Sequence, residues 1–115
     1  MSSNMPFQPC IGTTTGKTVK VIANNTPSSV SGTLDTTGLL AETLLVTNNG
    51  TVIVFARMSA ELPPTATAAD VPIPAGSGRV FANPNPGGKV GLAVISSTTT
   101  SCDVYFTPGA GGHVQ

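Results

Sequence analysis

The sequence has very few charged residues. Charged side chains make up 9% of the 115 residues and balance to a net charge of zero, whereas a typical domain carries about 25%. Because nucleic-acid-binding proteins use clustered Lys and Arg to neutralise phosphates, the lack of a basic run argues against a nucleic-acid partner. Interface centres are depleted in charge, so the composition favours a protein partly covered in an assembly over a monomer with a neutral, Ser- and Thr-rich surface.

Cysteine, histidine and tryptophan are nearly absent as well. The chain has two cysteines, Cys10 and Cys102, one histidine, His113, and no Trp. A structural zinc site takes four ligands, so these residues predict no metal site. Acid–base catalysis most often uses His, but His113 lies in a Gly-rich tail, and the acidic residues show no paired spacing. We therefore predict neither an enzyme nor a cofactor, and we favour two free, buried thiols over a disulfide.

Long hydrophobic runs are also missing. No stretch approaches the roughly 18 apolar residues of a membrane span, so we expect no membrane partner. The first ten residues, MSSNMPFQPC, lack the basic start and apolar run of a signal peptide. This predicts a protein that is not exported.

Glycine and proline, in contrast, are plentiful and punctuate the whole chain. The 13 Gly and 10 Pro leave few uninterrupted windows of a dozen residues, which excludes long helices. Short β-branched runs lie between these breaks, a spacing typical of all-β proteins. We predict an all-β fold, an antiparallel two-sheet sandwich that is jelly-roll-like, with about seven or eight strands.

The chain divides into three parts on this interpretation. Residues 1–16 form an extended N-terminal arm, because Pro6 and Pro9 keep this segment out of a sheet interior. Residues 17–108 form the β-sandwich domain, and residues 109–115 form a flexible Gly-rich tail.

Four residues are candidates for partner binding. Met5, Phe7 and Ile11 give the arm apolar side chains that need a surface to dock on, and the neutral composition favours a neighbouring molecule. Tyr105 is the fourth candidate, because it follows the alternation of its strand and faces the side opposite to Phe106. We predict that the arm makes intermolecular contacts.

Two β-hairpins are the clearest local signals. Residues 42–47 (ETLLVT) and 51–58 (TVIVFARM) flank Asn48-Asn49-Gly50, and Asn and Gly tolerate the positive φ that tight hairpin turns demand. Residues 89–96 (KVGLAVIS) and 102–107 (CDVYFT) flank the polar residues 97–101 in the same manner. The alternation within the strands predicts a core that contains Val19, Val21, Val46, Val54, Phe81, Val94 and Phe106.

Three segments follow one another in a distinctive order: LLVTNNGTVIVFARM (44–58), VPIPAGSGRVF (71–81) and VGLAVISSTTTSCDVYFTPGAGG (90–112). A strand ends in an Asn-Gly turn, a strand with Phe follows, and a tyrosine strand closes on Thr-Pro-Gly. This succession resembles small virion structural proteins of tailed bacteriophages. The resemblance covers roughly residues 44–112 and identifies no binding residues.

The resemblance implies a β-sandwich or jelly-roll protein of the virion. The nearest role is a capsid cement (decoration) protein, which clamps neighbouring subunits of the major capsid protein and is itself a homo-oligomer, a trimer or a dimer. Such a protein is assembled in the host cytoplasm and ends on the capsid surface. The alternative from another class is a receptor- or sugar-binding domain of a phage fibre or a similar adhesive module.

Overall fold

The computed structural model describes residues 7–9, 18–24, 30–38, 41–60, 65–67 and 69–111. These residues form β-strands and no helix, which confirms the prediction of an all-β fold. The strands are β1 (Gln8–Pro9), β2 (Val19–Ala23), β3 (Val30–Asp35), β4 (Thr43–Asn48), β5 (Val54–Ser59), β6 (Val71–Ile73), β7 (Gly78–Ala82), β8 (Lys89–Ser96) and β9 (Cys102–Ala110).

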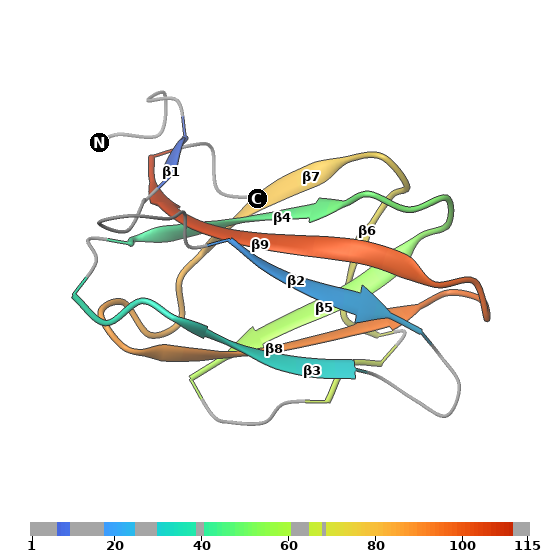
Figure 1. The fold of residues 1–115 in the computed structure, drawn as a ribbon, viewed down its shortest axis with the longest axis horizontal. Coiled ribbons are helices and arrows are strands. Elements are labelled where there is room, and N and C mark those ends of the chain that lie inside the picture. The colour runs from blue at the N-terminus through green and yellow to red at the C-terminus, as the bar shows by residue number, and fades with distance from the viewer. Residues whose placement is uncertain are drawn as a thin grey trace.

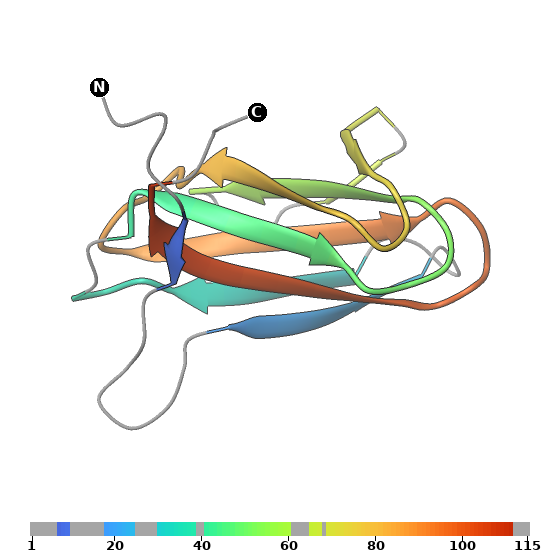
Figure 2. The same cartoon turned by 90° about the horizontal axis from the view of Figure 1, so that it is seen from above.

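The strands form two antiparallel sheets that pack face to face (Figure 1), so the predicted two-sheet sandwich is confirmed. One sheet has the order β2-β9-β4-β7, and the other has the order β3-β8-β5-β6. The short strand β1 pairs with the same edge of β9 as β2 does, but further along, beside the C-terminal end of β9 (Figures 1 and 2).

The pairing is that of one long hairpin rolled up on itself. Leaving β1 aside, the first strand pairs with the last, the second with the last but one, and so on inwards: β2 with β9, β3 with β8, β4 with β7 and β5 with β6. Two further pairs, β4 with β9 and β5 with β8, join these hairpin segments into sheets. Eight strands in this connectivity make a jelly roll.

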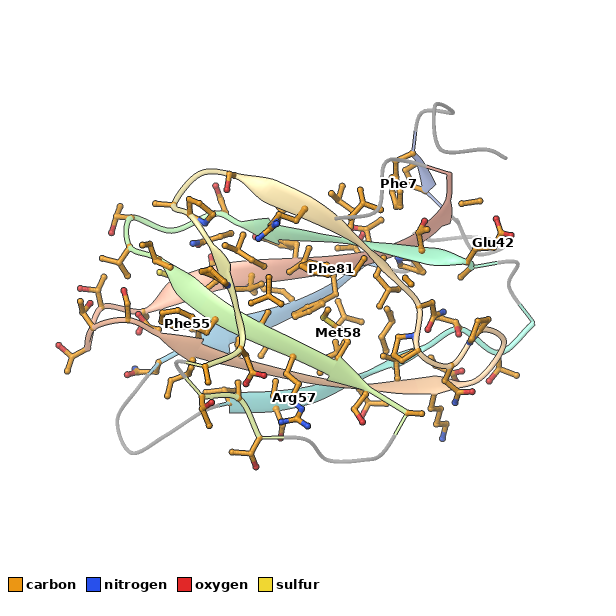
Figure 3. The ribbon with its side chains drawn as sticks, turned by 180° about the vertical axis from the view of Figure 1, so that it is seen from behind. Phe7, Glu42, Phe55, Arg57, Met58 and Phe81 are labelled. Atoms are coloured by element: carbon orange, nitrogen blue, oxygen red, sulfur yellow. The ribbon has the colours of Figure 1, made fainter. Side chains whose placement is uncertain are left out.

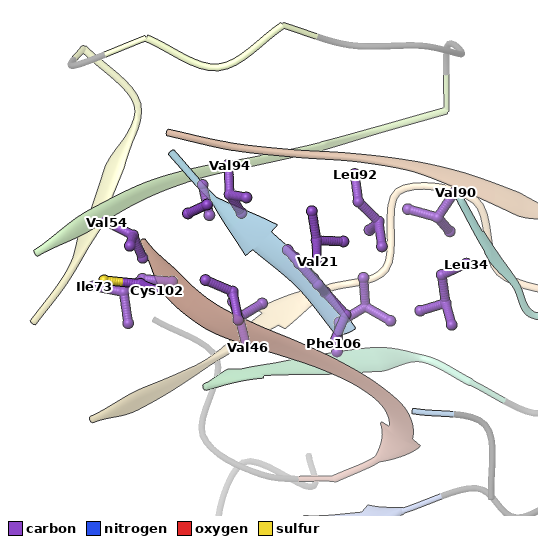
Figure 4. Close-up of a cluster of buried hydrophobic side chains, with 14 residues drawn as sticks. Val21, Leu34, Val46, Val54, Ile73, Val90, Leu92, Val94, Cys102 and Phe106 are labelled. Atoms are coloured by element: carbon purple, nitrogen blue, oxygen red, sulfur yellow. The ribbon is translucent and has the colours of Figure 1, made fainter. Parts of the chain in front are cut away.

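The core lies between the two sheets and takes inward-pointing residues from β2, β3, β4, β5, β6, β8 and β9 (Figure 4). Five of the predicted core residues are buried: Val21, Val46, Val54, Val94 and Phe106. The other two, Val19 and Phe81, are only partly buried and pack against the cluster. Both belong to strands at a sheet edge, β2 and β7, where one side of the strand has no neighbour to cover it.

Both predicted hairpins are wrong, although their strands exist. The strand β4 pairs with β7 and β9, whereas β5 pairs with β6 and β8, so the two strands lie in opposite sheets. The strands of the second predicted hairpin also lie in opposite sheets, because β8 pairs with β3 and β5, whereas β9 pairs with β2 and β4. Each connection is therefore an arch between the sheets. The error arose because turn residues show where the chain bends but not which strand it meets.

The first arch is held by the side chain of Asn48, which is fully buried. Its amide group donates to the carbonyl oxygens of Val52 (2.8 Å) and Ile73 (3.0 Å), while its Oδ1 accepts the N–H of Gly50 (2.9 Å). The bond to Ile73 anchors the arch to β6, a strand of the opposite sheet.

Gly50 serves this arch by its small size. Its φ is not among the positive values found for described glycines, contrary to the hairpin prediction. A Cβ at this position would lie 2.6 Å from Cβ of Cys102, far closer than real side chains approach. Cys102 is itself a free, buried thiol, as predicted.

The boundaries of the sandwich differ from those expected. The strand β9 continues to Ala110, two residues beyond the predicted end of the domain, because it is paired there with both β1 and β4. Within the predicted arm, Gln8 and Pro9 pair with β9 of the same chain. The edge position of β1 agrees with the exclusion of Pro9 from a sheet interior. Several predicted features lie outside the described residues: Met5, Cys10, Ile11 and residues 112–115.

Candidate interaction surface

Tyr105 lies on the outer face of the β2-β9-β4-β7 sheet. Its neighbours in β9, Val104 and Phe106, are fully buried and point into the core, so the alternation directs Tyr105 outwards. In the ladders it stands opposite Lys20 of β2 and Thr47 of β4. Because paired residues of neighbouring strands share a face, these three side chains form one row across the sheet.

A second row runs parallel to the first. Thr107 stands opposite Leu45, and Leu45 stands opposite Val80 of β7. At the other end of the row, the hydroxyl oxygens of Thr18 and Thr107 are 2.9 Å apart. This row therefore combines a hydroxyl pair with two half-buried aliphatic side chains.

The rows together define a surface that we call the outer β9 face. It also includes Ile22, which stands opposite Asp103 and is 47% exposed, the largest exposed fraction among the large hydrophobic residues that the structure describes. Only Lys20 and Asp103 bring charge to this face, and their charges are opposite. The members of the face are Thr18, Lys20, Ile22, Leu45, Thr47, Val80, Ala82, Asp103, Tyr105 and Thr107.

The other sheet does not leave its outer face open in this way. Ala93 of β8 lies between two core residues, Leu92 and Val94, so it points outwards, yet its exposed fraction is 0%. Described residues of the segment between β5 and β6 lie on the side of β5 and β8 away from the core (Figure 4), and among them Ala66 is 2% exposed. The protein thus covers part of this face with its own chain. Phe55 and Arg57 of β5 mark the same side of the molecule in Figure 3.

The two predicted binding residues that the structure describes, Phe7 and Tyr105, lie apart. Tyr105 lies within the outer β9 face, whereas Phe7 precedes β1 and is half-buried at one end of the molecule (Figure 3). Gln8, next to Phe7, pairs with Ala110, five residues beyond Tyr105. That separation is roughly 17 Å along an extended strand.

Several residues of this face were missed from the sequence alone. The alternation in β2, β4 and β7 contains the signal, since Ile22, Leu45 and Val80 each lie between residues that point inwards. That signal shows two faces per strand but not which faces of different strands are joined. The pairing of β4 with β9 and β7, which joins them, contradicts the predicted hairpin.

The chemistry of this face suits contact with another protein. Threonine and tyrosine hydroxyls both donate and accept hydrogen bonds, and the aliphatic side chains between them gain free energy when they leave water. Among the described residues, no three His, Cys, Asp or Glu side chains gather where they could hold a metal ion.

The described part of the chain also contains no helix that could cross a membrane. Comparisons of the chain with models of protein families, with curated proteins and with solved structures found no match.

Proposed function

We propose that this protein is a structural component of a tailed-phage virion, a capsid cement protein that binds the major capsid protein through the outer β9 face. The observation that carries the proposal is this face, which is nearly free of charge and whose members are all half-buried or exposed. Interface centres are depleted in charged residues and enriched in Tyr. The jelly roll is a common fold of viral capsid proteins, which supports the proposal only by analogy.

The rigidity of the sheet favours binding. The side chains of the face stand on hydrogen-bonded strands, and those of Thr, Val and Ile have few rotamers to lose. Binding therefore restricts few side-chain and backbone conformations, and the entropic cost of association is low. The hydroxyls of Thr47 and Thr107 can exchange water for polar groups of the partner, so few polar groups are left unpaired.

The size of the face shows how far it can act alone. Four strands spaced about 4.8 Å apart, with four rows spaced about 6.6 Å apart, give an area of roughly 400–500 Å². A standard interface buries about 800 Å² on each partner. One copy therefore offers about half of a standard interface, and a cement protein needs contacts from the N-terminal arm or from a second copy.

The test is purification of intact heads from the phage that encodes this chain. A cement protein is recovered with the heads at a copy number close to that of the major capsid protein. A fibre-tip domain would instead be present in few copies and would compete with the phage for cells, and that result would favour the receptor- or sugar-binding alternative.

A pair of variants tests the surface. Tyr105→Ala should raise the dissociation constant for heads about 30-fold, the effect of removing an interface residue worth about 2 kcal/mol, and so lower occupancy wherever the sites are not saturated. The matched control is Phe55→Ala, a half-buried aromatic on the outer face of the opposite sheet, which should leave occupancy unchanged. Equal occupancy for Tyr105→Ala and the unaltered protein would contradict the assignment of this surface.

A further inference from the structure

The four edges of the two sheets differ in how they are protected. An open edge offers unpaired N–H and C=O groups to any other strand, and proteins usually guard such edges. The edge strand β6 contains Pro72 and is followed by Pro74, which cannot donate hydrogen bonds. The edges β2 and β3 lie against each other, and a Cβ on Gly32 would be 3.1 Å from Cγ2 of Val21.

The edge strand β7 has no such protection among the described residues. It contains no proline, and its one charged residue is Arg79. Arg79 stands opposite Val46, a core residue, so its side chain leaves β7 on the inner side, and its guanidinium donates to the carbonyl of Pro72 (3.2 Å). The outer side of β7 carries only Gly78, Val80 and Ala82. In Figure 1, β7 is the outermost strand of its sheet.

The backbone of the same three residues faces away from the molecule. The N–H of Asn48 donates to Ser77 and that of Asn83 to Glu42, each at the end of the β4–β7 ladder. Hydrogen-bonded pairs in an antiparallel ladder recur at every second pair. Arg79 and Phe81 are therefore bonded to β4. The N–H and C=O groups of Gly78, Val80 and Ala82 point the other way, where no described strand pairs with them.

We propose that β7 pairs with β7 of a second copy of this chain, antiparallel about a two-fold axis at Val80. Val80 then stands opposite Val80 of the second copy, and Gly78 stands opposite Ala82. In this register every outward-facing backbone group meets a partner, which gives about six hydrogen bonds, two for each hydrogen-bonded pair. Such an interface is isologous, because the same patch is used by both copies.

The side chains favour a second copy as the partner. A strand that pairs with itself must avoid like charges opposite each other, and the outer side of β7 is uncharged. A β-branched pair at the axis contributes to stability, and the small residues on either side of it leave room for the neighbouring chain. No other edge combines free backbone groups, small side chains and neutrality in the described residues.

Pairing through β7 would join the two β2-β9-β4-β7 sheets into one continuous sheet. The outer β9 faces of the two copies would then be neighbours with a combined area of roughly 800–1,000 Å², the size of one side of a standard interface. This consequence rests on the proposed function, but the pairing itself does not. Because the paired edge alone is small, we expect a dissociation constant on the order of 0.1–1 mM in solution, and stronger pairing where copies are held close together.

The experiment is sedimentation equilibrium of the full chain from about 10 μM to about 1 mM. The unaltered protein is compared with variants that carry a charge at Val80, the residue on the two-fold axis. Val80→Lys and Val80→Glu should each weaken dimerisation at least about 10-fold, because like charges then stand directly opposite each other. An equimolar mixture of the two variants should dimerise at least as well as the unaltered protein. Thr33→Lys and Thr33→Glu on the exposed side of the edge strand β3 are the matched controls and should dimerise normally.

Ala82→Pro provides a second variant. Its N–H points away from β4, so proline at this exposed position removes an intermolecular bond without breaking the ladder within the chain, and dimerisation should again weaken. An unaltered protein that stays monomeric at about 1 mM would overturn the proposal, as would unchanged dimerisation of Val80→Lys or a mixture that does not associate. Occupancy of Tyr105→Ala on heads is measured separately, so either proposal can fail without the other.

Discussion

The outer faces of the two sheets are built from similar residues but are used differently. Described residues between β5 and β6 lie on the outer side of the β3-β8-β5-β6 sheet (Figure 4), and Ala93, which points to that side, is fully buried. The β2-β9-β4-β7 sheet presents Ile22, Tyr105 and Val80 without such a cover from the described chain. We expect from this contrast that the open face contributes little to the stability of the monomer. Residues that contribute little to folding can change during evolution to suit contact with a partner.

The sharpest test of this comparison uses two adjacent residues of β9 that point in opposite directions. Phe106→Ala should lower the free energy of unfolding by about 3–5 kcal/mol, because Phe106 is a fully buried aromatic residue. Tyr105→Ala, one residue away on the open face, should lower it by about 1 kcal/mol or less. Urea unfolding of both variants measures the difference. Similar losses would mean that the outer β9 face contributes to stability as much as the core does, which would contradict the difference between the two faces.

The two outer faces also differ only as long as the two sheets stay packed in this arrangement, and Asn48 helps to hold the sheets together. Asn48→Ala removes the donor from the Val52 and Ile73 carbonyls, and it removes the acceptor of the Gly50 N–H. Because these groups are largely buried, we expect a loss of about 2–3 kcal/mol. Asn49→Ala is the matched control, since Asn49 is exposed, and should change stability by about 0.5 kcal/mol or less. Thermal melts that do not separate the two variants would contradict this role.

A charge placed on each outer face compares the faces directly. Ala93→Asp puts a carboxylate at a fully buried position on the outer side of the β3-β8-β5-β6 sheet and should cost about 2 kcal/mol, with the loss becoming smaller once the carboxylate is protonated. Thr47→Asp on the open face should cost about 0.5 kcal/mol or less. Chemical denaturation of both variants at neutral pH is the measurement. Equal tolerance at the two positions would show that neither face is effectively covered.

The smallest effect on stability is expected from the N-terminal arm. Deletion of residues 1–9 removes β1, which contributes two residue pairs at the end of β9, so the melting temperature should change by only a few degrees. We still predict that the deletion lowers oligomerisation or occupancy on heads, because Met5 and Phe7 are apolar and extended segments gain from docking on a neighbour. Unfolding of the truncated protein would mean that the arm serves its own core. Unchanged occupancy and oligomerisation would show that the arm has no role in assembly.

The strands and the inward residues were predictable from the sequence, but the pairing was not. Val54 and Phe106 are inward because alternation is a local property of a strand. The partner of a strand is not local: Asn48 holds its arch through a bond to Ile73, which is 25 residues away. Tyr105 could be predicted as an outward residue for the same local reason. That Tyr105 lies on the same face as Leu45 and Val80 could not be predicted, because it depends on the pairing of β4 with both β9 and β7.

The pairing of β2 with β9 also bears on when the protein acquires its surfaces. Val19 stands opposite Phe106, so strands β3 to β8 must all be synthesised before β9, an inner strand of this sheet, can be inserted. Contacts so distant in sequence form slowly, because a long loop must close first. Until then β4 lacks β9, and neither a complete outer β9 face nor a stable β7 edge exists. The two surfaces that we propose for contacts thus form only after β9 has been synthesised and has paired with β2 and β4.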